Sequence, residues 1–174
     1  MAKEHKDGHK HLVLVGNPNV GKSVVFNYLT GLYVDVSNFP GTTVDVSQGT
    51  YNDYLVTDTP GIYGVSSFND EEKVAKEVIM KADLLLNVVD GVHLERDLFL
   101  TLQLADMGIP MLVVVNMMDE VKRQGIQLDL KRLEQYLGVP VIPIVAAQGI
   151  GLEDMTKKLS LATKGIKSTE ISTL

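Results

Sequence analysis

The chain lacks cysteine, an excess of basic residues and any long apolar run. Without cysteine it has no disulfide, no thiolate metal site and no cysteine nucleophile. Its 174 residues carry 16 Lys and Arg against 22 Asp and Glu, and this acidic balance disfavours nucleic acid as a partner. Apolar runs such as Ile109–Val115 are far shorter than the ~20 residues that span a bilayer, and MAKEHKDGHKH at the start lacks the apolar core of a signal peptide. We therefore expect a soluble chain with no nucleic-acid partner.

Apolar runs alternate regularly with helical patterns along the chain. Near-continuous Val, Ile and Leu runs are typical of strands buried on both faces, and their alternation with helices implies βαβ units. Gly31–Thr42 is rich in turn-forming residues and is expected to be a long loop, and Asn52-Asp53 is expected to turn a hairpin. The sequence predicts an α/β fold of three layers, with a mostly parallel six-stranded sheet, one antiparallel edge strand and helices on both faces. We expect strands at 11–15, 43–50, 54–58, 84–89, 111–115 and 141–145, and helices at 22–30, 70–81, 94–107, 129–137 and 152–162.

The segment GNPNVGKS, residues 16–23, matches the phosphate-binding pattern G-x-x-x-x-G-K-[ST] between an expected strand and an expected helix. Its glycines allow backbone N–H groups to wrap around phosphate oxygens, and the following helix adds its positive end. Lys22 is expected to reach the terminal phosphates, and the Ser23 hydroxyl to bind Mg²⁺. The alternative is a glycine-rich turn that fits the pattern by chance. The expected nucleotide contacts here are Asn17, Pro18, Asn19, Val20, Gly21, Lys22, Ser23 and Val24.

A second segment, NMMD at residues 116–119, follows an expected strand and suits the recognition of a base. A carboxylate accepts two neighbouring N–H groups, and guanine offers that pair where adenine presents an acceptor. Asp119 is therefore a candidate for guanine selection, with Asn116 bracing the loop, although either could instead cap a helix. Met117 replaces the Lys that is usual in this motif and can lie against a flat base.

The turn VAAQG, residues 145–149, is placed to offer a backbone N–H to the guanine oxygen. Ala146 stands where Ser or Thr is commoner. We expect nucleotide contacts from Ala146, Ala147 and Gln148, although a turn of small residues before a helix would look the same.

The segment DTPG, residues 58–61, ends another expected strand, where a nucleotide switch senses the last phosphate. Asp58 is expected to bind Mg²⁺ through water, and the Gly61 N–H to contact the γ-phosphate. Of two loop hydroxyls we favour Thr43 over Thr42 as a metal ligand in the triphosphate state. The alternatives are β-propensity for the threonines and turn formation for Asp58.

Ile62 follows DTPG at the position where many such switches have the Gln that orients the attacking water. Ile62 cannot hydrogen-bond, so another group must supply charge and hold the water. Asn19 lies within the phosphate-binding segment, and its amide oxygen is a candidate ligand for a monovalent cation; the alternative is a hydrogen bond within its own turn. The expected catalytic set is Asn19, Lys22, Thr43 and Gly61.

In this order the motifs indicate a GTPase domain of the P-loop type, with a Ras-like G-domain fold. The segments VSNFPGTTVDVSQG (36–49), residues 85–110 and VVVNMMDE (113–120) resemble the bacterial ferrous iron transport protein B family. The resemblance runs from about Leu12 to Leu161, and departs from the family at Phe39, where Trp is common, and Asp45, where Glu is common.

The resemblance implies a slow, K⁺-stimulated GTPase with K⁺ at Asn19 and Mg²⁺ at Ser23, Thr43 and Asp58. It implies a domain on the cytoplasmic face of a bacterial membrane protein that imports Fe²⁺, with the transporter's helical and membrane regions and small accessory iron-uptake proteins as partners. We expect a polar tail at 1–10, a G domain at 11–164 and the start of a truncated helical segment at 165–174.

Two alternatives belong to other functional classes. One is a free-standing soluble GTPase of ribosome or RNA maturation, although the sequence has no basic RNA-binding segment. The other is a nucleotide-binding module without turnover, suggested by Ile62.

Overall fold

The computed structural model describes residues 8–31, 34–66 and 68–163. Most of the two expected tails, 1–7 and 165–174, lies outside these ranges. Lys10, assigned above to the amino-terminal tail, is instead the first residue of a strand. The strands are β1 (Lys10–Gly16), β2 (Asp35–Asn38), β3 (Asp45–Tyr51), β4 (Tyr54–Asp58), β5 (Leu84–Asp90), β6 (Met111–Asn116) and β7 (Val141–Pro143). The helices are α1 (Lys22–Thr30), α2 (Asp70–Met80), α3 (Leu94–Asp106), α4 (Met118–Arg123), α5 (Leu130–Leu137) and α6 (Leu152–Thr163), with short 3₁₀ turns η1 (Gly91–His93) and η2 (Ala146–Gln148).

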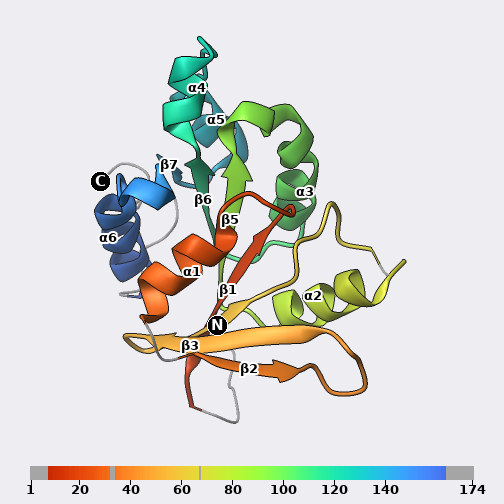
Figure 1. The fold of residues 1–174 in the computed structure, drawn as a ribbon. Helices are drawn as coiled ribbons and strands as arrows, with labels where there is room; N and C mark the ends of the chain where they lie inside the picture. The colour runs from red at the N-terminus through yellow and green to blue at the C-terminus, as the bar shows by residue number, and fades with distance from the viewer. Residues whose placement is uncertain (1–7, 32–33, 67, 164–174) are drawn as a thin grey trace.

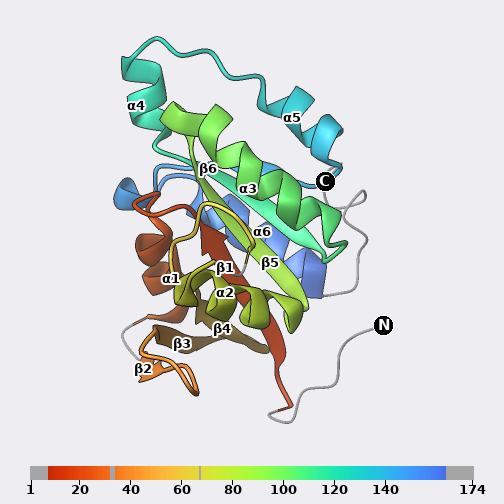
Figure 2. The ribbon, with the colours of Figure 1, turned by 90° about the vertical axis from the view of Figure 1, so that its right-hand side faces the viewer.

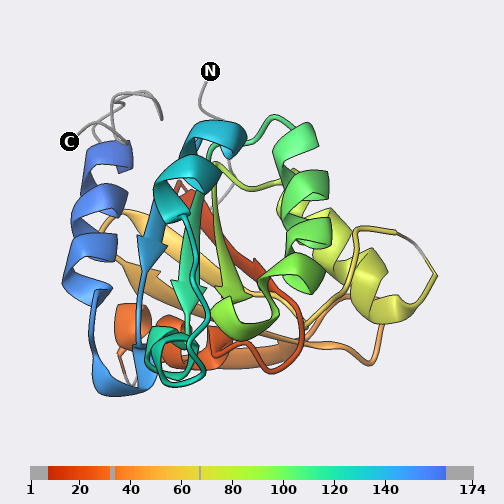
Figure 3. The same ribbon diagram turned by 90° about the horizontal axis from the view of Figure 1, so that it is seen from above.

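The strands form one sheet in the order β2-β3-β4-β1-β5-β6-β7. Neighbours are parallel except around β3, which runs antiparallel to both β2 and β4. Figure 1 shows α1 and α6 on one face of the sheet, and Figure 3, seen from above, shows α2 and α3 on the other. The three-layer α/β class is therefore confirmed.

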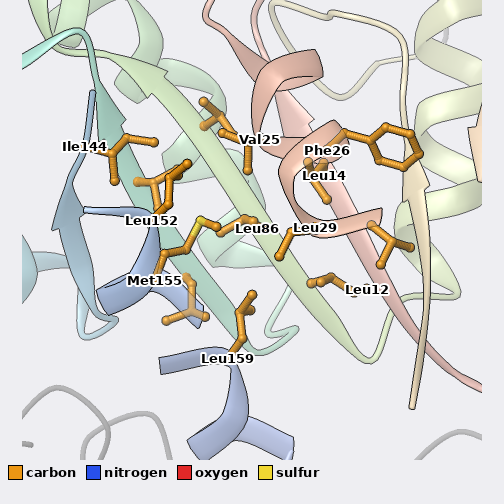
Figure 4. Packing of buried hydrophobic residues seen from close by; sticks show 14 of the residues in the cluster. Leu12, Leu14, Val25, Phe26, Leu29, Leu86, Ile144, Leu152, Met155 and Leu159 are labelled. Carbon is orange, nitrogen blue, oxygen red and sulfur yellow. The ribbon is translucent and has the colours of Figure 1, made fainter. Parts of the chain in front are cut away.

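Alternate residues of each central strand supply the two cores. On β1, Leu12 and Leu14 pack under α1 and α6, whereas Val13 and Val15 pack under α2 and α3. Figure 4 shows the first cluster, where Phe26 of α1 and Met155 of α6 lie among strand residues. Burial on both faces explains the near-continuous apolar runs of the sequence.

Within the described residues the sheet has seven strands, not the six predicted, and its antiparallel strand β3 is not at the edge. The edge strand is β2, which lies inside the segment that we expected to be a loop. All four of its residues, DVSN, are exposed, so the sequence has no apolar pattern from which this strand could be predicted. The strand forms by pairing with β3, from Asp35 opposite Gln48 to Asn38 opposite Asp45. Its pairing partner, rather than its own composition, makes it a strand.

Two other boundaries differ from the prediction. Strand β7 stops at Pro143, because Val145 leaves the sheet to form an antiparallel bridge with Ile150. Helix α4 was not predicted: its six residues, MDEVKR, bury only Val121, which is too little for a helical period to show.

Side-chain caps fix the start of some helices but not of α1. Asn69 accepts a hydrogen bond from the Glu72 N–H at 2.8 Å and begins α2, and Asp129 accepts one from the Arg132 N–H at 3.0 Å and begins α5. Helix α1 follows Gly21 with no side-chain cap. Its first N–H groups therefore have no side-chain acceptor that caps them.

Candidate functional site

The loop from Gly16 to Ser23 joins β1 to α1 at the carboxyl end of the strand, and Figure 1 shows it in red. Gly16 and Gly21 both lie too close to neighbouring atoms to carry a side chain. A Cβ on Gly16 would lie 2.6 Å from the Val88 carbonyl oxygen, and one on Gly21, whose φ is 90°, would lie 2.2 Å from the Asn116 amide nitrogen. The spacing of the motif thus reflects contacts with two neighbouring strands as well as room for a ligand.

Lys22 is the first residue of α1, and the residue as a whole is buried, at 9% exposure. Its ammonium donates hydrogen bonds to the Asp58 carboxylate and to the Thr59 carbonyl. Burial raises the pKa of Asp58, and the nearby Lys22 charge opposes this only partly. The structure thus brings together two predicted site residues that are 36 positions apart in the sequence.

Hydrogen bonds connect the chain after β4 to β1 and to the phosphate-binding segment, residues 16–23 (the P-loop). The Thr59 hydroxyl donates to the Leu14 carbonyl at 2.7 Å, and the Ile62 N–H donates to the Gly16 carbonyl at 3.0 Å. Gly61 lies so close to the loop that a Cβ would meet the Pro18 Cα at 2.8 Å. DTPG and the phosphate-binding segment therefore form one contiguous surface.

The side chain of Ile62 faces away from that surface, into the core. It is 2% exposed and belongs to the apolar cluster beneath α2 and α3. The position that often carries a water-orienting Gln is therefore a packing position in this chain.

Helix α3 contributes residues that the sequence analysis missed. The Asn17 amide donates to the Asp97 carboxylate at 2.9 Å, and Asp97 also accepts from the Asp90 N–H at 2.8 Å and from Arg96 at 2.9 Å. Six residues further along α3, Gln103 accepts the Val65 N–H at 2.7 Å. A charged residue on the buried side of the expected helix was the available signal for Asp97, which is 1% exposed.

Asn116 connects the two segments expected at the phosphates and the base. Its amide donates to the Val20 carbonyl at 3.0 Å, and its oxygen accepts the Ala146 N–H at 2.9 Å. It therefore braces the loop, as predicted, and does not cap α4, whose cap position is Met117 with no side-chain bond. The Ala146 N–H is used within the protein, so any base contact of this turn must come from its neighbours.

Met117 and Asp119 lie just beyond this brace. Met117 has a φ of 64°, the left-handed region that non-glycine residues rarely adopt, and α4 begins directly after it. Asp119 is exposed in the first turn of α4, and its carboxylate accepts a hydrogen bond from the Gln148 side chain at 3.3 Å. Asp119 and Gln148 are therefore close together and open to solvent, whereas Met117 is half-buried.

The first-switch threonines differ in their surroundings. The Thr42 hydroxyl donates to the Phe39 carbonyl at 2.9 Å and accepts the Val44 N–H at 3.1 Å. Thr43 is exposed, and its side chain bonds to none of the residues that the structure describes. Phe39 and Val44 pack against α2, and Figure 2 shows the β2–β3 turn below that helix. Among the described residues, no hydrogen bond links Thr43 to Ser23 or Asp58.

Asn19 has a φ of 64° and an exposed side chain. Within ranges 8–31, 34–66 and 68–163 its amide makes no hydrogen bond, so the alternative of a bond within its own turn is not seen. The left-handed backbone turns this residue outward between Pro18 and Val20.

The donor set of this surface suits a phosphate and a hard metal ion. Ser23 offers an exposed hydroxyl and Asp58 a carboxylate, and oxygen ligands are those that Mg²⁺ prefers. The uncapped start of α1 and the Lys22 ammonium suit an anion. Among the described residues, no three His, Asp or Glu side chains cluster as a metal site, and no helix is long and apolar enough to cross a bilayer.

Comparisons with known proteins agree on one family. The family described as "Ferrous iron transport protein B" matches residues 10–159. A protein named Fe(2+) transporter FeoB from Legionella pneumophila (strain Paris) is 40% identical over 174 residues, covering 93% of this chain. The chain spans only 23% of that protein's length.

Solved structures give the same result. The FeoB G-domain of Methanococcus jannaschii is 40% identical, with a TM-score of 0.75 over 90% of this chain and 98% of that one. An S. thermophilus NFeoB variant bound to mGDP is 39% identical, with a TM-score of 0.84 over 88% of this chain and 61% of that one. These matches favour a transporter domain over a free-standing GTPase of ribosome maturation. The chain belongs to the ferrous iron transport protein B family and matches its G domain.

Proposed function

We propose that this chain binds GTP and GDP and hydrolyses GTP slowly, acting as a nucleotide switch. One observation carries the proposal: Asn116 bonds both to the P-loop, at Val20, and to the base-side turn, at Ala146. A phosphate-binding loop and a candidate guanine reader are thereby held in one rigid unit at the carboxyl edge of the sheet, where α/β folds bind ligands. Solved relatives with mGDP or GDP bound support it.

The surroundings of Lys22 indicate how the phosphates of the nucleotide would bind. Its ammonium, held by Asp58 and Thr59, is placed to turn toward phosphate oxygens that dock on the uncapped N–H groups of α1. Ser23, Asp58 (through water) and, after movement of the β2–β3 turn, Thr43 would hold Mg²⁺, which neutralises charge on the phosphates. The Gly61 N–H, beside Pro18, would contact the γ-phosphate.

The base is proposed to bind at Asp119, with Met117 against its face and the Ala147 N–H at its oxygen, because the Ala146 and Gln148 N–H groups are bonded within the protein. Asp119 is exposed and next to Gln148, and both lie just past the brace at Asn116. An ionised carboxylate there accepts the two N–H groups that only guanine presents.

Asn19 is proposed to hold K⁺ beside the phosphates. Its exposed side chain makes no bond within the described parts of the chain, and Ile62 is buried and cannot orient water. A monovalent cation there would supply the charge that other GTPases take from an arginine, with backbone groups of residues 39–43 left to hold the water.

We further propose that residues 11–164 are the G domain of an Fe²⁺ transporter, at the cytoplasmic face of a bacterial membrane. The support is the name of the relatives and the chain's 23% share of their length. Its partners would be the transporter's own helical and membrane regions and small accessory iron-uptake proteins.

Calorimetry with GDP, ADP and xanthosine diphosphate tests the proposal. Asp119→Asn places an amide N–H against a guanine N–H and should weaken GDP binding about tenfold to more than a hundredfold, from the loss of ~1.5–3 kcal/mol. Xanthosine diphosphate has an acceptor at that edge, so its binding to Asp119→Asn should recover the lost hydrogen bond. Glu120→Gln, one residue along α4, is the control and should bind GDP normally. Unchanged GDP binding by Asp119→Asn would remove the proposed role.

A further inference from the structure

The side chain of Gln148 lies across the carboxylate that is proposed to select guanine. Gln148 ends the turn η2, and its amide nitrogen donates to Asp119 Oδ2 at 3.3 Å. Both side chains are exposed, so neither the fold nor burial requires the contact. The bond joins helix α4 to the turn η2, through two residues that are 29 positions apart in the sequence.

The backbones on both sides of this contact are fixed. The Ala146 N–H is held by Asn116 at 2.9 Å, and the Gln148 N–H donates to the Val145 carbonyl at 3.0 Å. On the other side the Met118 N–H donates to the Ile144 carbonyl at 3.3 Å, next to Asp119. Only the two side chains need to move for the carboxylate to open.

The chemistry of the contact is that of the proposed ligand. A carboxamide presents two N–H groups on one nitrogen, and guanine presents two N–H groups on one edge. Both bond to the same carboxylate, so a guanine edge that takes both of its oxygens has to share Oδ2 with the Gln148 amide or displace that amide. We propose that Gln148 is an internal competitor for guanine at Asp119; this inference rests on the proposed function of Asp119.

The competition has a defined size and a kinetic signature. A hydrogen bond of ordinary net strength to a charged, exposed group is formed in most molecules, so the Asp119 carboxylate is open to guanine in only a fraction of them. The apparent affinity for the nucleotide falls in proportion to that fraction. This corresponds to about three- to tenfold in Kd. Because the competitor has left before guanine binds, it slows association and leaves dissociation unchanged.

Gln148→Met tests this directly, since it keeps the side-chain length and removes the donor. Stopped-flow binding of a fluorescent GDP analogue with Mg²⁺ should show association about three to ten times faster than in the wild type. The dissociation rate should stay the same, and Kd should fall by the same factor. ADP, which does not use the carboxylate, should bind equally to both proteins.

The matched control is Gln124→Ala. Gln124 makes the same kind of bond, to Glu120 at 2.6 Å on α4, but lies away from Asp119's partner turn. It should leave both rate constants unchanged. Gln148→Ala should act like Gln148→Met, which excludes an effect of the new methionine.

The outcomes separate the two proposals. If Asp119→Asn weakens GDP binding but Gln148→Met leaves Kd unchanged, the competitor role is wrong and the guanine reader stands. A rise in Kd through faster dissociation would also overturn the inference, because Gln148 would then hold the base. If Asp119→Asn leaves GDP binding intact, the proposed function fails first.

Discussion

The ammonium of Lys22 contacts the carboxylate of Asp58, so the lysine of the P-loop and the acid that ends β4 are paired with each other. Both side chains are largely buried, at 10% and 14% exposure. A phosphate must therefore draw Lys22 from Asp58, while a metal ion must take the carboxylate. In a Mg²⁺–nucleotide complex, the positive Lys22 would thus face the phosphates and the negative Asp58 the metal ion.

The raised pKa of Asp58 predicts a pH dependence of stability. Burial is its main cause, and Lys22 opposes it. A carboxyl whose folded pKa lies above its unfolded value stabilises the fold at low pH and loses that contribution as pH rises through the folded pKa. Chemical denaturation between pH 4 and about pH 8 should therefore favour the wild type over Asp58→Asn increasingly as pH falls. A difference that grows in the opposite direction would contradict the assigned shift.

Asn116→Ala should lower both stability and nucleotide affinity. It leaves the Val20 carbonyl and the Ala146 N–H without their partner, and each orphaned buried group costs about 1–3 kcal/mol. We expect a loss of about 2–4 kcal/mol in urea unfolding and weaker GDP binding. The exposed Asn27 of α1, replaced by Ala, should cost far less. Equal losses in the two variants would show that Asn116 is not a brace.

Much of this site could be predicted because its residues are held by contacts that demand particular residue types. Gly16 and Gly21 meet neighbouring atoms too closely for a side chain, and these constraints are visible as a spaced motif. Asn116 likewise was expected to brace its loop, and it does.

What escaped prediction depends on partners distant in the sequence. Strand β2 exists through β3, and the acid at Asp97 acts on Asn17, which is 80 positions away. Gln148 was expected to contact the nucleotide, and only the fold shows that its side chain bonds to Asp119. Local patterns carry no information on such pairs.

The two threonines of the first switch should behave differently. Thr42 holds the turn between Phe39 and Val44, so Thr42→Ala should cost about 0.5–1.5 kcal/mol of stability. Thr43→Ala should leave stability and GDP binding intact but abolish most hydrolysis. Hydrogen exchange over residues 31–43 should show more protection with a GTP analogue than with GDP. Equal protection would argue against a γ-phosphate-sensing loop, and the reverse ranking of hydrolysis would assign the metal to Thr42.

Ile62 should matter for stability and little for catalysis. Its side chain is buried in the core, so Ile62→Ala should cost about 2–5 kcal/mol and Ile62→Val about 0.5–1.5 kcal/mol. The GTP turnover of molecules that remain folded should change little. Ile62→Gln should not accelerate hydrolysis, because the side chain points away from the P-loop surface. Thermal unfolding and phosphate release, measured on the same samples, check both parts; a faster Ile62→Gln enzyme would refute this placement.

The central proposal is that a cation at Asn19, instead of a Gln after DTPG, supports GTP hydrolysis. The direct measurement is multiple-turnover phosphate release from GTP with Mg²⁺, in K⁺ and in Na⁺ at equal ionic strength. We predict slow turnover that rises when K⁺ replaces Na⁺, a rise that Asn19→Ala erases with GDP affinity nearly intact, and no turnover in Lys22→Ala. Wild-type release that is no faster than in Lys22→Ala would contradict GTP hydrolysis, and a rate indifferent to K⁺ would contradict the cation at Asn19.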